Sequence, residues 1–318
     1  MPGQDSSGPE GGLSSDPQLL VELLVKRVLQ TGSLDPATAA GPQIESAIDR
    51  CERLILAGEA GARLWFAAAM LKLLAGQPLP ALNDLCQALA ACTVDGDMTA
   101  VTGWLATLQA FAEQQPGLAW AQRLIQLGRA ARFGAADALQ SLVTLSSKPV
   151  AELEGQIVIL AGGCDDQVQR QMQTYRDVLL EGFEGGSGTI ISGGTTAGIA
   201  GLAGDLAETY PASWRVIGYL PRTIPSNVVV NERYQQLIRT PADDFSPLEP
   251  LQIWTDLLAA KVSPAEVKLI GINGGAISRL EFLLVRMLGG QLGIVRGSGR
   301  EASRLEEAWQ AQLPPRCT

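Results

Sequence analysis

The second half of the chain alternates short β-branched runs with helical patterns, and this alternation constrains the fold more than any other feature. Five apolar runs stand out from residue 156 onward, at 156–160, 188–192, 214–220, 267–273 and 291–295, and residues 237–239 could form a further short strand. Runs of this length, bounded by glycine or proline, are typical of buried strands. Strands that alternate with helices predict a parallel sheet with helices on both faces. We therefore expect an α/β fold, with a Rossmann-like domain over residues 156–311.

The first half of the chain follows a helical pattern instead. Leu20, Leu24 and Val28 fall at helical spacing, as do Ile44, Ile48 and later residues. Further helices are expected at 44–55, 62–74, 80–91, 98–113, 118–127 and 131–145. An all-helical domain is therefore predicted over residues 17–147, in front of the Rossmann-like domain.

The composition changes around residues 146–155, where the helical pattern ends. A domain linker is therefore expected at 148–155. The first residues, 1–16, are rich in glycine, serine and proline, which is typical of a disordered tail, and 312–318 form a second tail.

Charge and residue usage exclude several classes of function. With 24 basic and 33 acidic residues the net charge is -9, and no basic cluster indicates nucleic-acid binding. The chain has no histidine, which excludes imidazole bases and histidine-ligated metals, so no metal site is expected. The five cysteines include no C-x-x-C pair and are typical of reduced thiols. We expect a cytoplasmic protein without a membrane span.

Four of the expected strands end in turns that carry glycine or hydroxyl residues. Carboxyl ends of parallel strands meet at one edge of a sheet, where ligands bind, and glycine turns let backbone amides approach an anion. The alternative for each turn is close packing without a ligand. The G-x-G-x-x-G and Walker A patterns are absent. The predicted ligand-binding residues are Gly162, Gly163, Gly193, Gly194, Thr195, Thr196, Gly198, Gly274, Gly275, Ser278, Ser298, Gly299 and Arg300.

Two of these turns resemble motifs of the SLOG superfamily. The stretch Ser192-Gly-Gly-Thr-Thr-Ala-Gly-Ile-Ala-Gly201 is similar to the G-G-G-x-x-G-L-M-G turn of LOG phosphoribohydrolases, and closer to the variant in TRPM channels. Asn273-Gly-Gly-Ala-Ile-Ser-Arg-Leu-Glu281 is similar to the LOG motif P-G-G-x-G-T-x-x-E, with both leading glycines and the glutamate retained. It departs at Asn273, Ile277 and Ser278, which stand for Pro, Gly and Thr. The resemblance covers about residues 155–310 and is nearest to the prokaryotic, LSDAT-like kind of TRPM-type domain.

The resemblance implies a domain that binds a nucleotide-derived ligand, as the TRPM region binds ADP-ribose in some members. Bacterial relatives of this type are suspected to sense nucleotide signals in conflict or defence systems. A sensor of this kind needs no cofactor, and the helical half would then serve oligomerisation or coupling to an effector protein.

Two other functions stay open at this point. The first is a nucleotide N-glycosidase in which Glu281 is the catalytic carboxylate, a role that needs no histidine. The second is an interaction scaffold whose Rossmann-like half binds nothing.

Overall fold

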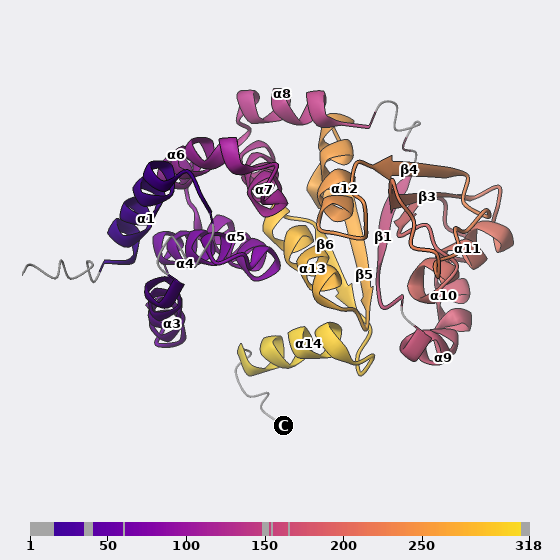
Figure 1. Ribbon diagram of the computed structural model, residues 1–318. Coiled ribbons are helices and arrows are strands. Elements are labelled where there is room, and N and C mark those ends of the chain that lie inside the picture. The colour runs from indigo at the N-terminus through magenta and orange to yellow at the C-terminus, as the bar shows by residue number, and fades with distance from the viewer. Residues whose placement is uncertain are drawn as a thin grey trace, which may run out of the picture.

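The computed structural model describes residues 16–34, 41–59, 61–147, 153, 155–164 and 166–312, and over them the chain forms a helical layer followed by a parallel sheet (Figure 1). This arrangement confirms the α/β, Rossmann-like fold class that the sequence predicts. Most of the predicted tails, and the predicted linker apart from residues 153 and 155, lie outside the described residues.

The described part of the first half is helical throughout, with short 3₁₀ turns on both sides of α6. The 3₁₀ turns lie at Asp95–Met98 and Gln109–Phe111, where the sequence predicts one continuous helix over 98–113. The helices are α1 (Pro17–Thr31), α3 (Gly41–Leu56), α4 (Ala62–Leu74), α5 (Pro78–Ala91), α6 (Thr99–Leu108), α7 (Pro116–Phe133) and α8 (Ala136–Leu145).

Helix α7 is longer than the sequence pattern suggests. The pattern places a break after Leu127, but the helix continues through Gly128 to Phe133 and is capped by Gly134, which has φ 64°. A Cβ atom at position 128 would lie 3.0 Å from the Leu89 side chain, so glycine there lets α7 approach α5 closely. Glycine at position 128 therefore serves the packing of α7 against α5.

The described strands form one six-stranded parallel sheet in the order β4-β3-β2-β1-β5-β6. The chain moves outward from β1 to β4 and then returns to the other side of β1, which makes the β1/β5 boundary a topological switch point. Residues 157–162 of β1 pair in register with residues 267–272 of β5. The strands are β1 (Gln156–Gly162), β2 (Gly188–Ser192), β3 (Trp214–Pro221), β4 (Gln236–Thr240), β5 (Val267–Ile272) and β6 (Gln291–Ile294).

Alternate side chains of the strands serve two different faces. In β1, Ile157 and Ile159 join the larger hydrophobic cluster, while Val158 and Leu160 join the smaller one. The smaller cluster lies beneath α9 (Asp166–Thr174), α10 (Arg176–Phe183) and α11 (Gly198–Thr209). The pattern predicts one helix over 166–183, but the chain breaks between α9 and α10, where the Tyr175 amide bonds the Met172 carbonyl at 3.0 Å.

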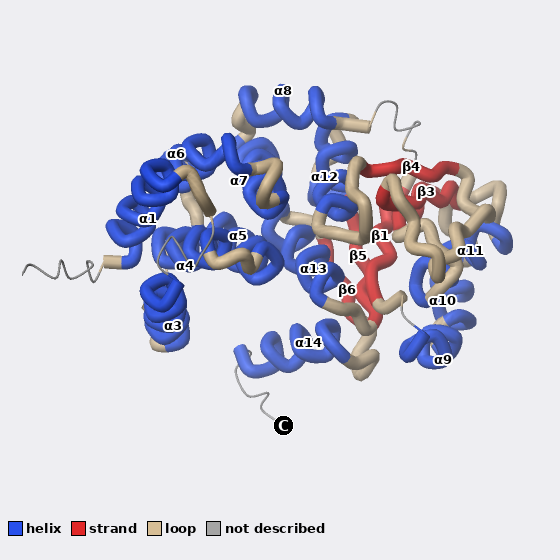
Figure 2. Tube along the Cα trace, viewed as in Figure 1, coloured by secondary structure: helices blue, strands red, loops and turns tan. Residues whose placement is uncertain are grey.

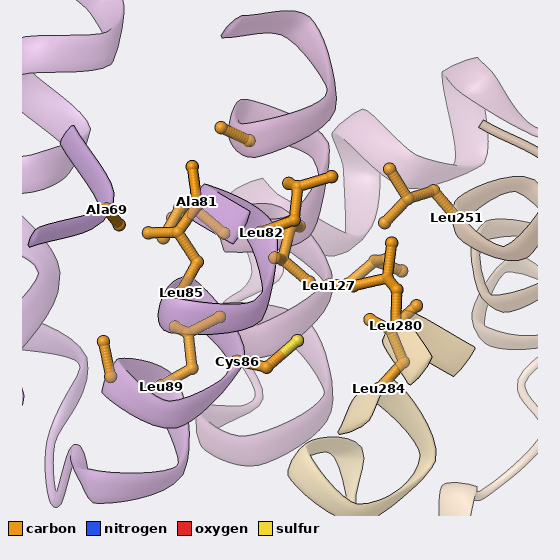
Figure 3. Close-up of a cluster of buried hydrophobic side chains, with 14 of the residues drawn as sticks. Ala69, Ala81, Leu82, Leu85, Cys86, Leu89, Leu127, Leu251, Leu280 and Leu284 are labelled. Carbon is orange, nitrogen blue, oxygen red and sulfur yellow. The ribbon is translucent and has the colours of Figure 1, made fainter. Parts of the chain in front are cut away.

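The opposite face is covered by α12 (Leu248–Ala259) and α13 (Ala276–Leu288), and the last described helix is α14 (Arg300–Gln312) (Figures 1 and 2). Helices α5, α7 and α8 pack onto α12 and α13. Figure 3 shows Leu82 and Leu127 of this helical layer beside Leu251 and Leu280. One hydrophobic core therefore runs from the N-terminal helices to the sheet.

None of the described helices is both long and apolar enough to cross a membrane.

Candidate functional site

A cavity of ≈ 900 Å³ opens at the carboxyl edge of the sheet. Turns after β1, β2 and β5 contribute to its wall, together with the loop after β3 and the first turns of α12 and α13. This is the position expected for a ligand site in an open parallel sheet, beside the switch point. Its volume falls in the range of cavities that enclose a small organic ligand.

Most of the residues predicted as ligand-binding lie in this wall, and so does the predicted catalytic residue. They come from three turns and the start of α14, which are far apart in the sequence but meet at the sheet edge. The residues in the wall are Gly162, Gly163, Gly193, Thr195, Thr196, Gly275, Ser278, Glu281 and Arg300. Gly194, Gly198, Gly274, Ser298 and Gly299 are not among the lining residues.

The start of α11 differs from the phosphate cradle that its glycine turn suggests. The Gly198 amide donates to Oε1 of Gln169 at 2.6 Å, and the Ile199 amide donates to the Gly163 carbonyl at 3.0 Å. The Thr196 amide is also engaged, by the Val229 carbonyl at 3.0 Å. These donors serve contacts within the protein, so the turn after β2 shapes the cavity without offering its helix amides.

The start of α13 is arranged differently. Gly275, Ala276, Ile277 and Ser278 all line the cavity, and the helix amides of the last three have no acceptor among the described residues. The first intrahelical bond of this turn runs from the Arg279 amide to the Gly275 carbonyl, at 2.9 Å. The first amides of a helix, with the positive end of its dipole, favour an anion. Of the predicted turns, this one offers donors to a ligand.

The turn at 297–299 supports the end of β5. The Ser298 hydroxyl accepts a hydrogen bond from the Asn273 amide at 2.9 Å, and the Ser298 carbonyl accepts from Asn273 Nδ2 at 2.8 Å. Asn273 has φ 62°, and its side chain accepts from the Gly274 amide at 2.8 Å. Ser298 is therefore a structural residue, and only Arg300, just beyond this turn, reaches the cavity wall.

Gly194 and Gly198 owe their place to backbone geometry and close contacts. Both have positive φ, at 72° and 57°. A Cβ at Gly194 would lie 2.9 Å from the Leu220 side chain, and one at Gly198 would lie 2.0 Å from the Gly163 carbonyl oxygen. At these two positions the glycines therefore allow close packing, which was the alternative to ligand binding for each turn.

Two carboxyl groups lie in the same wall, Glu249 on the first turn of α12 and Glu281 on the second turn of α13. Glu281 is half-buried and has no hydrogen bond within the described part of the chain. Burial, and then the nearby Glu249 carboxyl, raise the pKa of Glu281 to about 8. Its carboxyl group is therefore largely protonated at neutral pH and can donate a proton or a hydrogen bond into the cavity.

Glu249 is buried and engaged by its own loop. Its carboxylate accepts from the Thr240 hydroxyl, and from the Ser246 amide and hydroxyl at 2.8 and 3.2 Å. Burial raises the pKa of Glu249, and these hydrogen bonds oppose the rise. Glu249 thereby fixes the segment that brings Phe245 to the cavity.

Sequence reasoning missed several wall residues, among them Leu79, Cys164, Tyr219, Phe245 and Glu249. None of them belongs to a repeated glycine pattern. The position of Phe245 after β4 was a usable signal, because any loop that follows a parallel strand meets the same edge. Leu79 comes from the helical half and carries no such signal.

Among the described residues, no group of three histidine, cysteine, aspartate or glutamate side chains is placed to hold a metal ion.

No protein-family model matches this chain, and no curated protein does. The likeness to the SLOG superfamily therefore rests on the two motifs and stays a prediction.

Proposed function

We propose that the protein binds a nucleotide-derived small molecule in the cavity at the carboxyl edge of the sheet and acts as a cytoplasmic sensor of it. The observation that carries the proposal is the start of α13, where three helix amides without acceptors line the cavity, in a wall that Arg300 shares. A phosphate bound there would receive backbone hydrogen bonds, the helix dipole and a guanidinium charge.

The rest of the wall suits the remainder of a nucleotide. Phe245 and Ile253 give apolar surface for a base, while Glu281 and Thr195 give polar groups for a ribose. The ligand class we favour is ADP-ribose or a cyclic relative, which the resemblance to TRPM-type domains supports. In such a sensor the helical half would couple the ligand to an effector or to a second copy of the chain.

Calorimetry with ADP-ribose, cyclic ADP-ribose, NAD and AMP tests this proposal. A saturable response to at least one of them is expected from the wild-type protein. A ligand at 100 times its Kd would also stabilise the fold by about 2.7 kcal/mol, which a thermal scan detects. No response to any of the four would overturn the proposal.

A variant at the start of α13 tests the position of the phosphate. Ala276 is exposed at this helix end, so Ala276→Asp keeps the helix, because a carboxylate is favourable in a first turn. The added charge repels a phosphate, and binding should fall by about tenfold or more. Ala276→Asn is the matched neutral control and should bind nearly as the wild type does.

A second function, nucleotide N-glycosidase, is favoured by Glu281 itself. A carboxyl group that keeps its proton to about pH 8 can protonate the leaving adenine of AMP as the C1′–N bond breaks, and the resulting carboxylate takes the proton of the water that adds to the ribose C1′. The nicotinamide of NMN or NAD leaves neutral, so there the carboxyl group would act on the attacking water alone. Release of free base from AMP, NMN or NAD, followed by chromatography, would identify this activity. Glu281→Gln should then abolish base release while ligand binding persists. If the wild-type protein binds a ligand but releases no base, the N-glycosidase is excluded and the sensor remains.

A further inference from the structure

One wall residue of the cavity comes from the helical half. Leu79 lies in the first turn of α5, is partly exposed, and lines the same cavity as Glu249 and Glu281. It precedes Leu82 by three residues, so the two side chains share one face of the helix. Leu82 is fully buried in the core beside Leu280 of α13 (Figure 3). The face of α5 that packs against α13 therefore continues into the cavity.

Helices α12 and α13 each have one side in the cavity and one side against the helical half. On α12, Ile253 lines the cavity, while Leu251 joins the core shared with Leu127 (Figure 3). On α13, Glu281 lines the cavity, and the neighbouring Leu280 joins the same core. A close-packed interior transmits strain, so a displacement of these cavity walls would be passed to the helical half.

A buried hydrogen-bond network holds the helical half at this place. The Asp256 carboxylate on α12 accepts from the Ser147 amide, just after α8, at 2.7 Å and from Gln252 at 2.8 Å. Gln252 also donates to the Leu145 carbonyl at 3.1 Å and accepts from Arg123 of α7 at 2.7 Å. These bonds fix α7 and the end of α8 against α12, and through the shared core they fix α5.

We infer that the helical half is part of the ligand site, and that Leu79 is the residue through which it limits the size of the bound molecule. The inference rests on the proposed function, because it concerns the same cavity. It gives the helical half a role in selecting the ligand, beyond coupling to an effector. A ligand that presses on Leu79 would also press on α5 and α13, which share the core.

The full-length protein with two substitutions at Leu79 tests this inference, with ADP-ribose, cyclic ADP-ribose, NAD and AMP as probes. Leu79→Trp fills the cavity from the side of α5, and the Kd of the probe that the wild type binds best should rise by about tenfold or more. Leu79→Ala enlarges the cavity and should change the ratio of the Kd values for AMP and ADP-ribose by about fivefold, in favour of the larger probe. Leu56→Trp and Leu56→Ala, on an exposed side chain of α3, are the matched controls.

Circular dichroism and the thermal midpoint show whether each variant is folded, and Leu79→Ala alone decides the question if Leu79→Trp does not fold. Changes in Kd at Leu79 but not at Leu56 support the inference. Wild-type Kd values for every probe in a folded Leu79 variant would overturn it, although the cavity would still be the ligand site. A wild-type protein that binds none of the probes contradicts the proposed function instead.

Discussion

The phenol oxygen of Tyr219 lies 2.9 Å from Oδ2 of Asp256. This buried hydrogen bond joins the cavity wall to α12, the helix against which α7 and α8 pack. Tyr219 is 2% exposed and Asp256 is 1% exposed. Burial, and then the Asp256 charge, raise the pKa of Tyr219, so the phenol remains a donor. Asp256 thus accepts hydrogen bonds from Tyr219 of β3, from Gln252 of α12 and from Ser147, which follows α8.

Loss of the Asp256 carboxylate should destabilise the whole fold. Asp256→Ala leaves the Tyr219 hydroxyl and the Ser147 amide without their acceptor, which should lower the free energy of unfolding by about 3–5 kcal/mol. Tyr219→Phe removes a single donor and should cost about 1–2 kcal/mol. Urea denaturation measures both. Asp177→Ala, at a side chain 95% exposed, is the control, and an Asp256→Ala protein as stable as this control would contradict the prediction.

The fold could be predicted because its signal is local and repeated. Strands β1, β2, β3 and β5 each contain a β-branched run closed by a turn, and such runs need no knowledge of their neighbours to be recognised. The rule that carboxyl ends of parallel strands converge then brings Gly163, Gly193 and Gly275 to one cavity. The break between α9 and α10 has no such signal, because no glycine or proline marks Tyr175.

The site was predicted less completely, because whether a glycine faces a ligand or packs against the protein depends on the atoms that surround it in the fold. Gly193 and Gly198 stand in the same turn, yet the first lines the cavity and the second packs against the Gly163 carbonyl. Leu79 and Glu249 reach the wall through contacts between elements far apart in the sequence. Tertiary packing decides these cases, and a single sequence does not encode it in a local pattern.

Alanine substitutions should separate packing glycines from ligand-facing ones. Gly198→Ala places a Cβ 2.0 Å from the Gly163 oxygen at a residue with φ 57°, and should lower the free energy of unfolding by more than about 3 kcal/mol. Gly275→Ala meets no atom within 4 Å and should change stability by less than about 1 kcal/mol. Thermal unfolding of the two variants measures the difference. Equal midpoints would show that the turn before α11 relaxes around a side chain.

Removing one charge of the buried ion pair between α4 and α5 should destabilise the fold, whereas replacing both charges with apolar side chains should change its stability little. Lys72 Nζ lies 2.8 Å from Asp84 Oδ2 and 2.9 Å from Glu52 Oε1, on a helix whose other residues from 64 to 74 are apolar. Asp84→Ala leaves a buried ammonium with one exposed partner and should cost about 3–5 kcal/mol. Lys72→Met combined with Asp84→Leu removes both charges and should recover most of that loss.

Urea denaturation of Lys72→Met, of Asp84→Leu and of the double variant completes a thermodynamic cycle for this pair. Asp243→Ala is the matched control, because its ion pair with Arg222 is exposed and should contribute less than about 1 kcal/mol. A double variant no more stable than Asp84→Ala would show that the charges themselves are needed in this core.

Glu281 should make the protein less stable as the pH rises. Its pKa in the folded protein is about 8, whereas its ordinary value is 4.5, so between these values the folded state holds a proton that the unfolded state releases. The free energy of unfolding should therefore fall from pH 5 to pH 8, by about 1–3 kcal/mol. The loss is smaller than the full shift in pKa implies, because Glu281 is only half-buried and its charge is partly screened by solvent.

Glu281→Gln removes this titration, so its stability relative to the wild type should increase steadily from pH 5 to pH 8. The chain has no histidine, so no imidazole titrates in that range. The Glu249 carboxyl, whose pKa is also raised by burial, is present in both proteins, so its own titration largely cancels in the comparison. Urea denaturation at four pH values measures the effect. Glu45→Gln, at an exposed side chain of α3, is the control. Parallel curves for the wild type and Glu281→Gln would mean that Glu281 is ionised in the folded protein, which would also remove the basis for a proton donor in the cavity.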